Sequence, residues 1–200
     1  MVRLFLCSIL LFIFSFGNSR NFVDTPLLYS LKIKLEVLSD RDQQNRTLIN
    51  IDKLYEAQFK FGIKSKEYQS VYQLITLYDS LNQQELVLIL DKYGWLGKNQ
   101  VGEKANEAIF FIIQHSNNKL RLKYISLMRA SVVKGESDEL HLRWLEDRIL
   151  QDQDMPLKYG TQGYTIQRKD GTREIYTNRK KANEELINEG FDTIPAPLKY

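Results

Sequence analysis

The sequence predicts a mainly α-helical protein, an antiparallel bundle-like domain that ends in a small β-hairpin. Apolar residues recur every three or four positions in successive segments from residue 25 onward, which is typical of amphipathic helices. Near the C-terminus, an Asp-Gly pair lies between two alternating segments, which is typical of a hairpin turn. The connections between the later helices are short, which favours antiparallel neighbours.

The N-terminus has the layout of a secretory signal peptide. Arg3 precedes an apolar run over residues 4–16, and the small polar residues 17–19 follow it. The run is shorter than the roughly 20 residues that a membrane-spanning helix needs. We therefore predict a leader over residues 1–19, a single domain over residues 20–200 and a periplasmic or secreted protein that meets a membrane only during export. A retained anchor and a cytoplasmic protein are the alternatives.

Composition excludes several classes of protein. The 43% hydrophobic and 26% charged residues are an ordinary globular mixture, and the net charge of +3 is not gathered in a basic block. We therefore expect no nucleic-acid partner. The only cysteine, Cys7, lies in the leader, so the mature chain would have no disulfide and no zinc-thiolate site.

The first half of the chain predicts helices over residues 25–46, 65–80 and 83–92, with an irregular connection over residues 47–64. Asp42 and Arg46 are four residues apart, so we expect them to pair on the surface of the first helix. Gly94-Trp95-Leu96-Gly97 then breaks the helical pattern, and we expect Trp95 to pack into the core.

Three further helices are predicted over residues 101–115, 120–134 and 139–151. The first is apolar on most of its surface, so Gln114 and His115 end a buried helix as polar groups that need partners. The second is expected to bury its helically spaced apolar side chains, and these are Leu122, Ile125, Met128 and Val132.

The C-terminal segment predicts a hairpin of residues 164–168 and 172–176, joined by a two-residue Asp170-Gly171 turn. In this register Ile166 faces Ile175, and Arg168 faces Arg173. Asn178 is expected to cap a last helix that ends at Gly190, after which Phe191 folds back on Ala182 or Leu186.

The sequence lacks a Gly-rich phosphate loop, a paired-histidine zinc motif and a nucleophile elbow. We predict no cofactor and no resident metal ion. A few polar residues could still converge, because a histidine oriented by a carboxylate is a general base and an arginine binds anions. The candidate catalytic residues are His115, Glu103 and Asp147; the candidate ligand-binding residues are Arg148, Gln114, Tyr159 and Gln162.

Three functions are compatible with this set. A binding module with a pocket for a small anionic or peptide-like ligand is the first hypothesis, and it predicts a cavity in which no carboxylate pairs with His115. A hydrolase-like enzyme with His115 as general base and Glu103 or Asp147 as the orienting carboxylate is the second. It predicts a carboxylate within hydrogen-bond reach of His115 around an open cavity. A structural envelope protein is the third, with His115 buried and satisfied by helix ends.

An ordered series of short motifs resembles a bacterial family known only as a domain of unknown function. The series, in sequence order, is Asp42-Gln43 with Arg46, Gly94-Trp95, Val101-Gly102, Gln114-His115, Gly135-Glu136, Asp147-Arg148, Tyr159-Gly160-Thr161-Gln162 and Asp170-Gly171. The resemblance runs from Leu27 to the C-terminus and implies a mostly helical domain, with no established activity, substrate or cofactor. This chain has Leu96 where the family usually has proline, and Leu157 where glutamine is usual.

Overall fold

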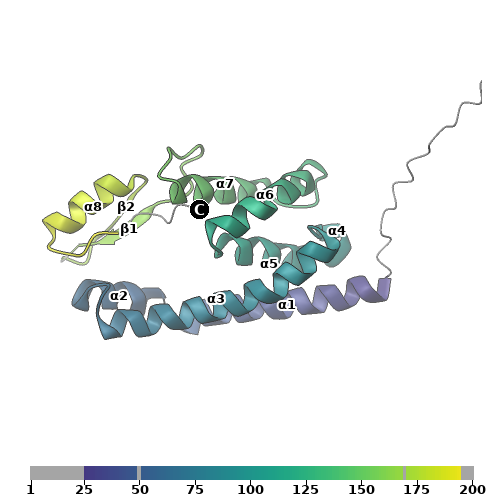
Figure 1. Cartoon of the computed structure of the whole chain (residues 1–200), viewed down its shortest axis with the longest axis horizontal. Helices are drawn as coiled ribbons and strands as arrows, with labels where there is room; N and C mark the ends of the chain where they lie inside the picture. The colour runs from purple at the N-terminus through teal and green to yellow at the C-terminus, as the bar shows by residue number, and fades with distance from the viewer. Residues whose placement is uncertain (1–24, 49–50, 169, 195–200) are drawn as a thin grey trace, which may run out of the picture.

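The computed structural model describes residues 25–48, 51–168 and 170–194 and confirms a mainly helical fold with a small hairpin. Two long helices and a shorter one form one layer, and the remaining helices and the hairpin lie along it (Figure 1). The elements are α1 (Thr25–Leu48), α2 (Ile51–Phe61), α3 (Lys66–Tyr93), α4 (Lys98–Val101), α5 (Glu103–Gln114), α6 (Asn118–Val133), α7 (Glu139–Asp152), β1 (Tyr164–Gln167), β2 (Arg173–Tyr176) and α8 (Arg179–Asn188).

The first layer differs from the sequence prediction in two ways. Residues 51–61 form the helix α2, where we expected an irregular connection. The two helices predicted over residues 65–92 are one continuous helix, α3. No glycine or proline interrupts this stretch, and Asn82 in its middle is buried and accepts a hydrogen bond from Arg41 of α1. The contact with α1 therefore favours helix where the apolar pattern alone is weak.

Several helices begin at a side chain that caps the first turn, and α3 ends at a glycine. The Ser65 side chain accepts a hydrogen bond from the Tyr68 amide and begins α3, as expected of an N-cap. Asn117, Asp138 and Asn178 begin α6, α7 and α8 in the same way. Gly94 has a φ of 73° and ends α3, which few residues other than glycine could do there.

The main hydrophobic core lies where α5 packs between α1 and α3 on one side and α6 and α7 on the other. Ile109, Phe110 and Ile113 of α5 are almost completely buried, as the apolar pattern of this helix predicts. In α6, Ile125 and Met128 are buried, but Leu122 is 46% exposed, because α6 is covered on one face only. Trp95 packs against this core while remaining partly buried.

Two glycine-containing loops, residues 94–97 and 135–137, contact each other at one end of the core. Trp95 donates its indole Nε1–H to Ser137 Oγ at 3.0 Å, and the buried Asn106 donates to both Ser137 and the Leu96 carbonyl. A Cβ on Gly97 would lie 2.6 Å from the Glu136 Cβ, so only glycine allows this approach. The Gly94-Trp95 and Gly135-Glu136 motifs are therefore joined in a structural contact.

The hairpin forms, but its predicted register is wrong by one residue. Ile166 pairs with Glu174, and Gln167 pairs with Arg173. The Arg168 amide donates to the Thr172 carbonyl, and Gly171 has a φ of 88°, which fits a three-residue loop ending in a left-handed glycine. Arg168 consequently forms an ion pair with Glu174 at 2.9 Å in place of the predicted opposition to Arg173.

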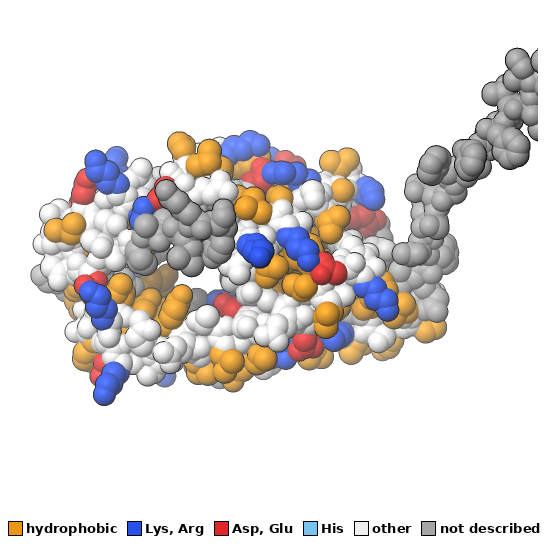
Figure 2. Space-filling view, in the orientation of Figure 1, with side chains coloured by type: hydrophobic (Ala, Val, Ile, Leu, Met, Phe, Trp, Pro, Cys, Tyr) orange, Lys and Arg blue, Asp and Glu red, His pale blue; other side chains and the backbone are white. Residues whose placement is uncertain are grey.

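A second, smaller core joins the hairpin to α8. Ile166, Ala182 and Leu186 are its buried residues, and Phe191 packs on them as the sequence predicts. The Phe191 ring also contacts Phe59 of α2, with ring centroids 5.7 Å apart. On the face shown in Figure 2, a hollow separates α2 and α3 from the hairpin and α8.

Among the described residues, no helix has the length and apolar character required to cross a membrane. The predicted leader, residues 1–19, lies outside the described part of the chain.

Candidate histidine–carboxylate site

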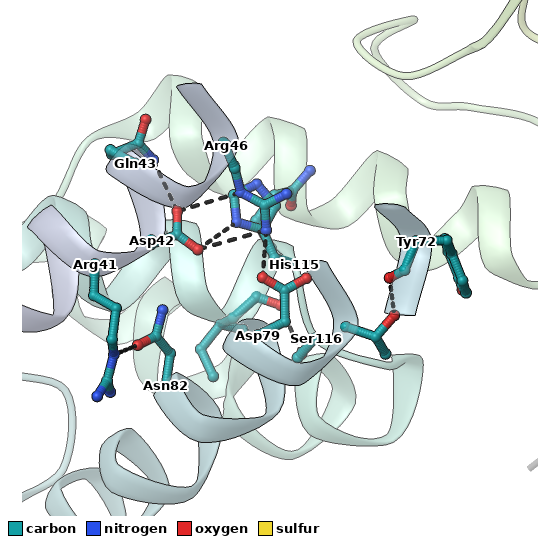
Figure 3. Close-up of polar contacts among 12 residues, drawn as sticks. Arg41, Asp42, Gln43, Arg46, Tyr72, Asp79, Asn82, His115 and Ser116 are labelled. Atoms are coloured by element: carbon teal, nitrogen blue, oxygen red, sulfur yellow. Dashed lines mark hydrogen bonds and ion pairs between the residues drawn. The ribbon is translucent and has the colours of Figure 1, made fainter. Parts of the chain in front are cut away.

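His115 ends α5 and lies beside a carboxylate from a different helix. Its Nδ1 is 3.1 Å from Asp42 Oδ1, and Asp42 belongs to α1, 73 positions away in the sequence (Figure 3). The His115 side chain is 19% exposed, whereas that of Asp42 is 1% exposed. The carboxylate is therefore shielded from water, while the imidazole retains access to solvent.

Asp42 is held by neighbours on its own helix as well. Arg46 lies one turn further along α1 and contacts Asp42 at 3.4 Å, and Gln43 Nε2 donates to Asp42 at 2.8 Å. Burial opposes ionisation of this carboxyl, but the hydrogen bond and charge of His115, together with Arg46, outweigh it. The pKa of Asp42 therefore lies below its ordinary value. The predicted pairing of Asp42 with Arg46 is present, though buried under α3 and α5 rather than on the surface.

Asp79 of α3 adds a second carboxylate to this cluster. Arg46 Nη2 is 2.6 Å from Asp79 Oδ1, so the guanidinium bridges the two aspartates. Burial raises the pKa of Asp79, and the charge of Arg46 offsets this only in part. The two aspartates are thus driven in opposite directions, a pattern common where carboxyl groups take different chemical roles.

The cluster also has the composition of a metal-binding group. Asp42, Asp79 and His115 each offer a ligand atom, and these atoms lie within 4.8 Å of one another. Two carboxylates and an imidazole suit several divalent ions. Arg46, however, already places a positive charge between the two carboxylates, so the cluster has a counter-charge without a metal.

The other two carboxylates predicted to orient His115 lie elsewhere. Glu103 is exposed in the first turn of α5, about 18 Å from the His115 end at a rise of roughly 1.5 Å per residue. Asp147 is buried in α7, and its oxygens accept the backbone N–H groups of Lys158, Tyr159 and Thr161. We therefore replace Glu103 and Asp147 with Asp42 as the carboxylate partner of His115.

The predicted ligand-binding residues lie in several environments. Tyr159 packs on the outer face of α7, where its hydroxyl donates to Glu146 at 3.0 Å and its ring lies beneath Arg143 and Lys158. Gln162 is partly buried in the segment that leads to β1. Gln114 is buried, and its Oε1 has no hydrogen-bond partner among the described residues.

Of the predicted ligand-binding residues, Gln114 directly precedes His115 in the chain, and Arg148 approaches the cluster from α7. The Arg148 side chain is partly buried in α7, and burial lowers the pKa of Arg148, with the positive charge of nearby Arg46 acting in the same direction. The two arginines therefore lie within electrostatic range of each other. Arg148 thus extends the polar region that begins at His115 toward the hairpin.

A cavity of about 830 Å³ lies between the end of α7 and α8. It is lined by residues such as Gln151, Tyr164 and Arg179, and none of the predicted site residues lines it. Gln151 accepts a hydrogen bond from Arg148 at 3.0 Å, so this cavity adjoins Arg148 through Gln151.

Sequence reasoning missed the partnership of His115 with Asp42 and the presence of Asp79. One signal was visible, because Asp79 is a charged residue directly after the apolar stripe that includes Tyr78. A carboxylate at the border of a buried helix face needs a partner. Its partner, Arg46, is 33 positions away, a separation that periodicity does not resolve.

The fold and the cluster define a helical domain with a shielded histidine–carboxylate pair. A model of a family of unknown function (DUF6624) matches residues 40–172, a span that begins just before Asp42 and ends at the hairpin turn. The chain belongs to this family, and the predicted membership of a domain-of-unknown-function family is confirmed. No curated protein and no solved structure gives a significant match.

Proposed function

We propose that the protein is a hydrolase-like enzyme in which His115 acts as the general base. The observation that carries the proposal is the 3.1 Å contact between His115 Nδ1 and the buried Asp42 carboxylate. An ionised carboxylate accepts hydrogen bonds only, so Nδ1 carries the proton in this pair. Nε2 of the neutral ring is then the unprotonated nitrogen, which is the atom that takes a proton in such dyads.

The surroundings of Asp42 support the same role. Arg46 and Gln43 hold the carboxylate in place, and the low pKa of Asp42 means that it stays ionised at neutral pH. An ionised, buried carboxylate stabilises the imidazolium that forms when His115 takes a proton. Asp42 is a positioning residue in this scheme, because it acts through His115.

Water is the nucleophile in the reaction we propose. The neighbouring hydroxyl of Ser116 donates to the Ile113 carbonyl at 2.7 Å and so is occupied by its own helix end. His115 Nε2 would take one proton from a water molecule while the water oxygen bonds to the electrophilic carbon or phosphorus. The bond to the leaving group then breaks, and His115 returns the proton to that group.

A binding module for a small anionic or peptide-like ligand is the second candidate. The observation that favours it is the partly buried Arg148, which binds to Gln151 but has no ion pair among the described residues. Such a module would bind a ligand without turnover. Export to the periplasm or beyond also stays a proposal, resting on residues 1–19, and mass spectrometry of the mature N-terminus would test it.

The test is turnover of a panel of model esters, phosphomonoesters and amides by the purified protein. We expect His115→Gln and Asp42→Asn to lower the rate for an accepted substrate by at least roughly 100-fold. His141 provides a matched control, because it stacks on Phe110 at 4.2 Å within the aromatic cluster and has no part in the proposed dyad. His141→Gln should retain turnover.

The result also separates the three hypotheses. Binding without turnover of any substrate class would favour the binding module. A structural role for His115 would be indicated if His115→Gln lowers the stability of the protein while wild type and variant show the same activity and the same binding, or show neither. Equal rates for His115→Gln and wild type would contradict the enzyme proposal directly.

A further inference from the structure

Arg148 has an unusual set of partners for a cation that is partly withdrawn from water. Its Nη1 donates to Gln151, which is neutral, while Nε is shielded from solvent and has no hydrogen-bond partner among the described residues. Nη2 also forms no hydrogen bond within this part of the chain. The edge formed by Nε and Nη2 therefore has no hydrogen-bond partner among the described residues, and this edge holds two parallel N–H donors.

The nearest carboxylate does not fill that edge. Asp152 lies one turn further along α7 and attracts Arg148 electrostatically. It is, however, paired with Arg121, which also donates to the Gln114 and Ser116 carbonyls. Asp152 therefore forms its ion pair with Arg121. The partly buried charge of Arg148 has no counter-ion among the described residues.

Two tyrosines approach Arg148 from different elements. Tyr55 of α2 and Tyr164 of β1 both lie near enough to influence the pKa of Arg148, so α2 and the hairpin both approach this side chain. Arg173 of β2 adds further positive charge there, since its guanidinium lies 5.5 Å from the centre of the Tyr55 ring. Figure 2 shows the hollow between these elements.

The register between α5 and α7 places Gln114 close to the Arg148 region. Asn106 and Phe110 of α5 contact Ser137 and His141, at the start of α7, so the two helices run in parallel along this interface. Gln114 is one turn beyond Phe110 on the same face, which places it level with Leu145, about one turn before Arg148 on α7. Its buried Oε1 is a second polar atom at this interface without a partner among the described residues.

We infer that the Nε–Nη2 edge of Arg148 binds an oxyanion, a carboxylate or phosphate group, of the molecule on which His115 acts. This inference deepens the proposed function and rests on it for the link to His115. A guanidinium edge matches two oxygens of such a group by two parallel hydrogen bonds. The tyrosine hydroxyls supply further donors, and the anion provides the counter-charge that Arg148 lacks.

The experiment measures binding of inorganic phosphate, acetate and chloride to the full chain at constant ionic strength. Isothermal titration gives the affinity, and ¹⁵N NMR of the Arg148 Nε–H reports whether this group is the one that binds. We expect phosphate or acetate to bind and to shift the Nε–H resonance, and Arg148→Met to lose at least roughly tenfold in affinity. Arg148→Lys keeps the charge without the planar edge and should lose affinity as well.

Arg143 supplies the matched control on the same helix, since it is exposed and already paired with Glu139. Arg143→Met should bind the anions as wild type does. Arg148→Met should remain folded, because methionine replaces a charge that has no counter-ion with an apolar side chain of similar length. Unchanged anion affinity in Arg148→Met, absence of phosphate and acetate binding in wild type, or equal binding of chloride would each overturn the inference.

The His115→Gln variant separates this inference from the proposed function. Anion binding that persists in His115→Gln, together with a wild-type protein that turns over no substrate of the panel, supports the Arg148 site and removes the enzyme proposal. Turnover that depends on His115 but is insensitive to Arg148→Met and Arg148→Lys keeps the enzyme proposal and removes the Arg148 site.

Discussion

Asp42 and Asp147 are both buried aspartates with a lowered pKa, yet their surroundings differ in kind. Asp147 accepts hydrogen bonds mainly from main-chain donors, the amides of Lys158, Tyr159 and Thr161, and also from the Thr161 hydroxyl. Asp42 is surrounded by side chains, and one of them, His115, can change its protonation state.

The difference indicates what each carboxylate does. Backbone amides cannot titrate or reorient, so Asp147 fixes the loop of residues 158–161 on α7, much as an N-cap fixes a helix. An imidazole can give up or accept a proton, so Asp42 can influence chemistry through its neighbour. Burial and a low pKa alone therefore do not distinguish a structural carboxylate from one in a candidate site; the identity of the donors does.

Replacing each aspartate by asparagine tests this difference directly, and Asp147→Asn has the larger expected effect on stability. The new amide nitrogen would face N–H donors, which leaves buried groups unsatisfied. We expect a loss of about 3 kcal/mol, which corresponds to a Tm decrease of roughly 6 to 12 °C. Differential scanning calorimetry measures it, and Thr161→Val, which removes one donor only, should cost less.

Asp42→Asn should cost less stability, about 1 to 2 kcal/mol. The asparagine carbonyl still accepts from Arg46 or Gln43, and its amide donates to His115 Nδ1 when the ring adopts the other tautomer. That tautomer places the proton on Nε2, so the base is lost while the fold is kept. Long-range ¹H–¹⁵N NMR of the imidazole would detect the change of tautomer. A stability loss equal to that of Asp147→Asn would show that the two sites do not differ as argued.

The acid dependence of stability gives the smallest effect and tests the sign of each pKa shift. Asp42 and Asp147 have folded-state pKa values below the ordinary 3.8, so their stabilisation is complete above that pH and is lost as pH falls through the folded values. Either asparagine variant should therefore show a shallower decrease of unfolding free energy in acid, measured by urea titration.

Asp79 should behave in the opposite way. Its pKa is raised above the ordinary 3.8, so its contribution to stability is present at low pH and is lost as pH rises through the folded value. The stability of Asp79→Asn relative to wild type should accordingly increase as pH rises above about 4. A relative stability that decreases over the same range would indicate that the ion pair with Arg46 dominates over burial.

Much of the fold was predictable because it depends on local patterns. The cap at Asn178 and the apolar face of α5 are short-range features, and they lie where the sequence indicated. The hairpin register was not predictable from Asp170-Gly171 alone. The same pair fits a two-residue and a three-residue loop, and these differ by one position.

The candidate site was predictable only in part. His115 and Arg148 were identified by residue type, because few other side chains perform acid–base chemistry or hold anions. The partner of His115 was not identified, since Asp42 lies 73 positions earlier in the chain and the contact depends on how α1 lies against α5. Asp147 was misjudged for the same reason, because the loop that satisfies it has no periodic pattern.

The small core of Ile166, Ala182 and Leu186 makes the hairpin and α8 a unit of their own beside the main core. Their described side-chain links to α2 and its end include the Phe59–Phe191 ring contact and the exposed Lys64–Asp192 ion pair. Units with so few buried contacts open at a lower free energy than the whole protein, so amide hydrogens in β1 and α8 should exchange faster than those in α5. Such an opening moves Tyr164 away from Arg148 while His115 and Asp42 stay on the main core. Entry and exit of a ligand would then be governed by one cooperative unit, and acid–base chemistry by another.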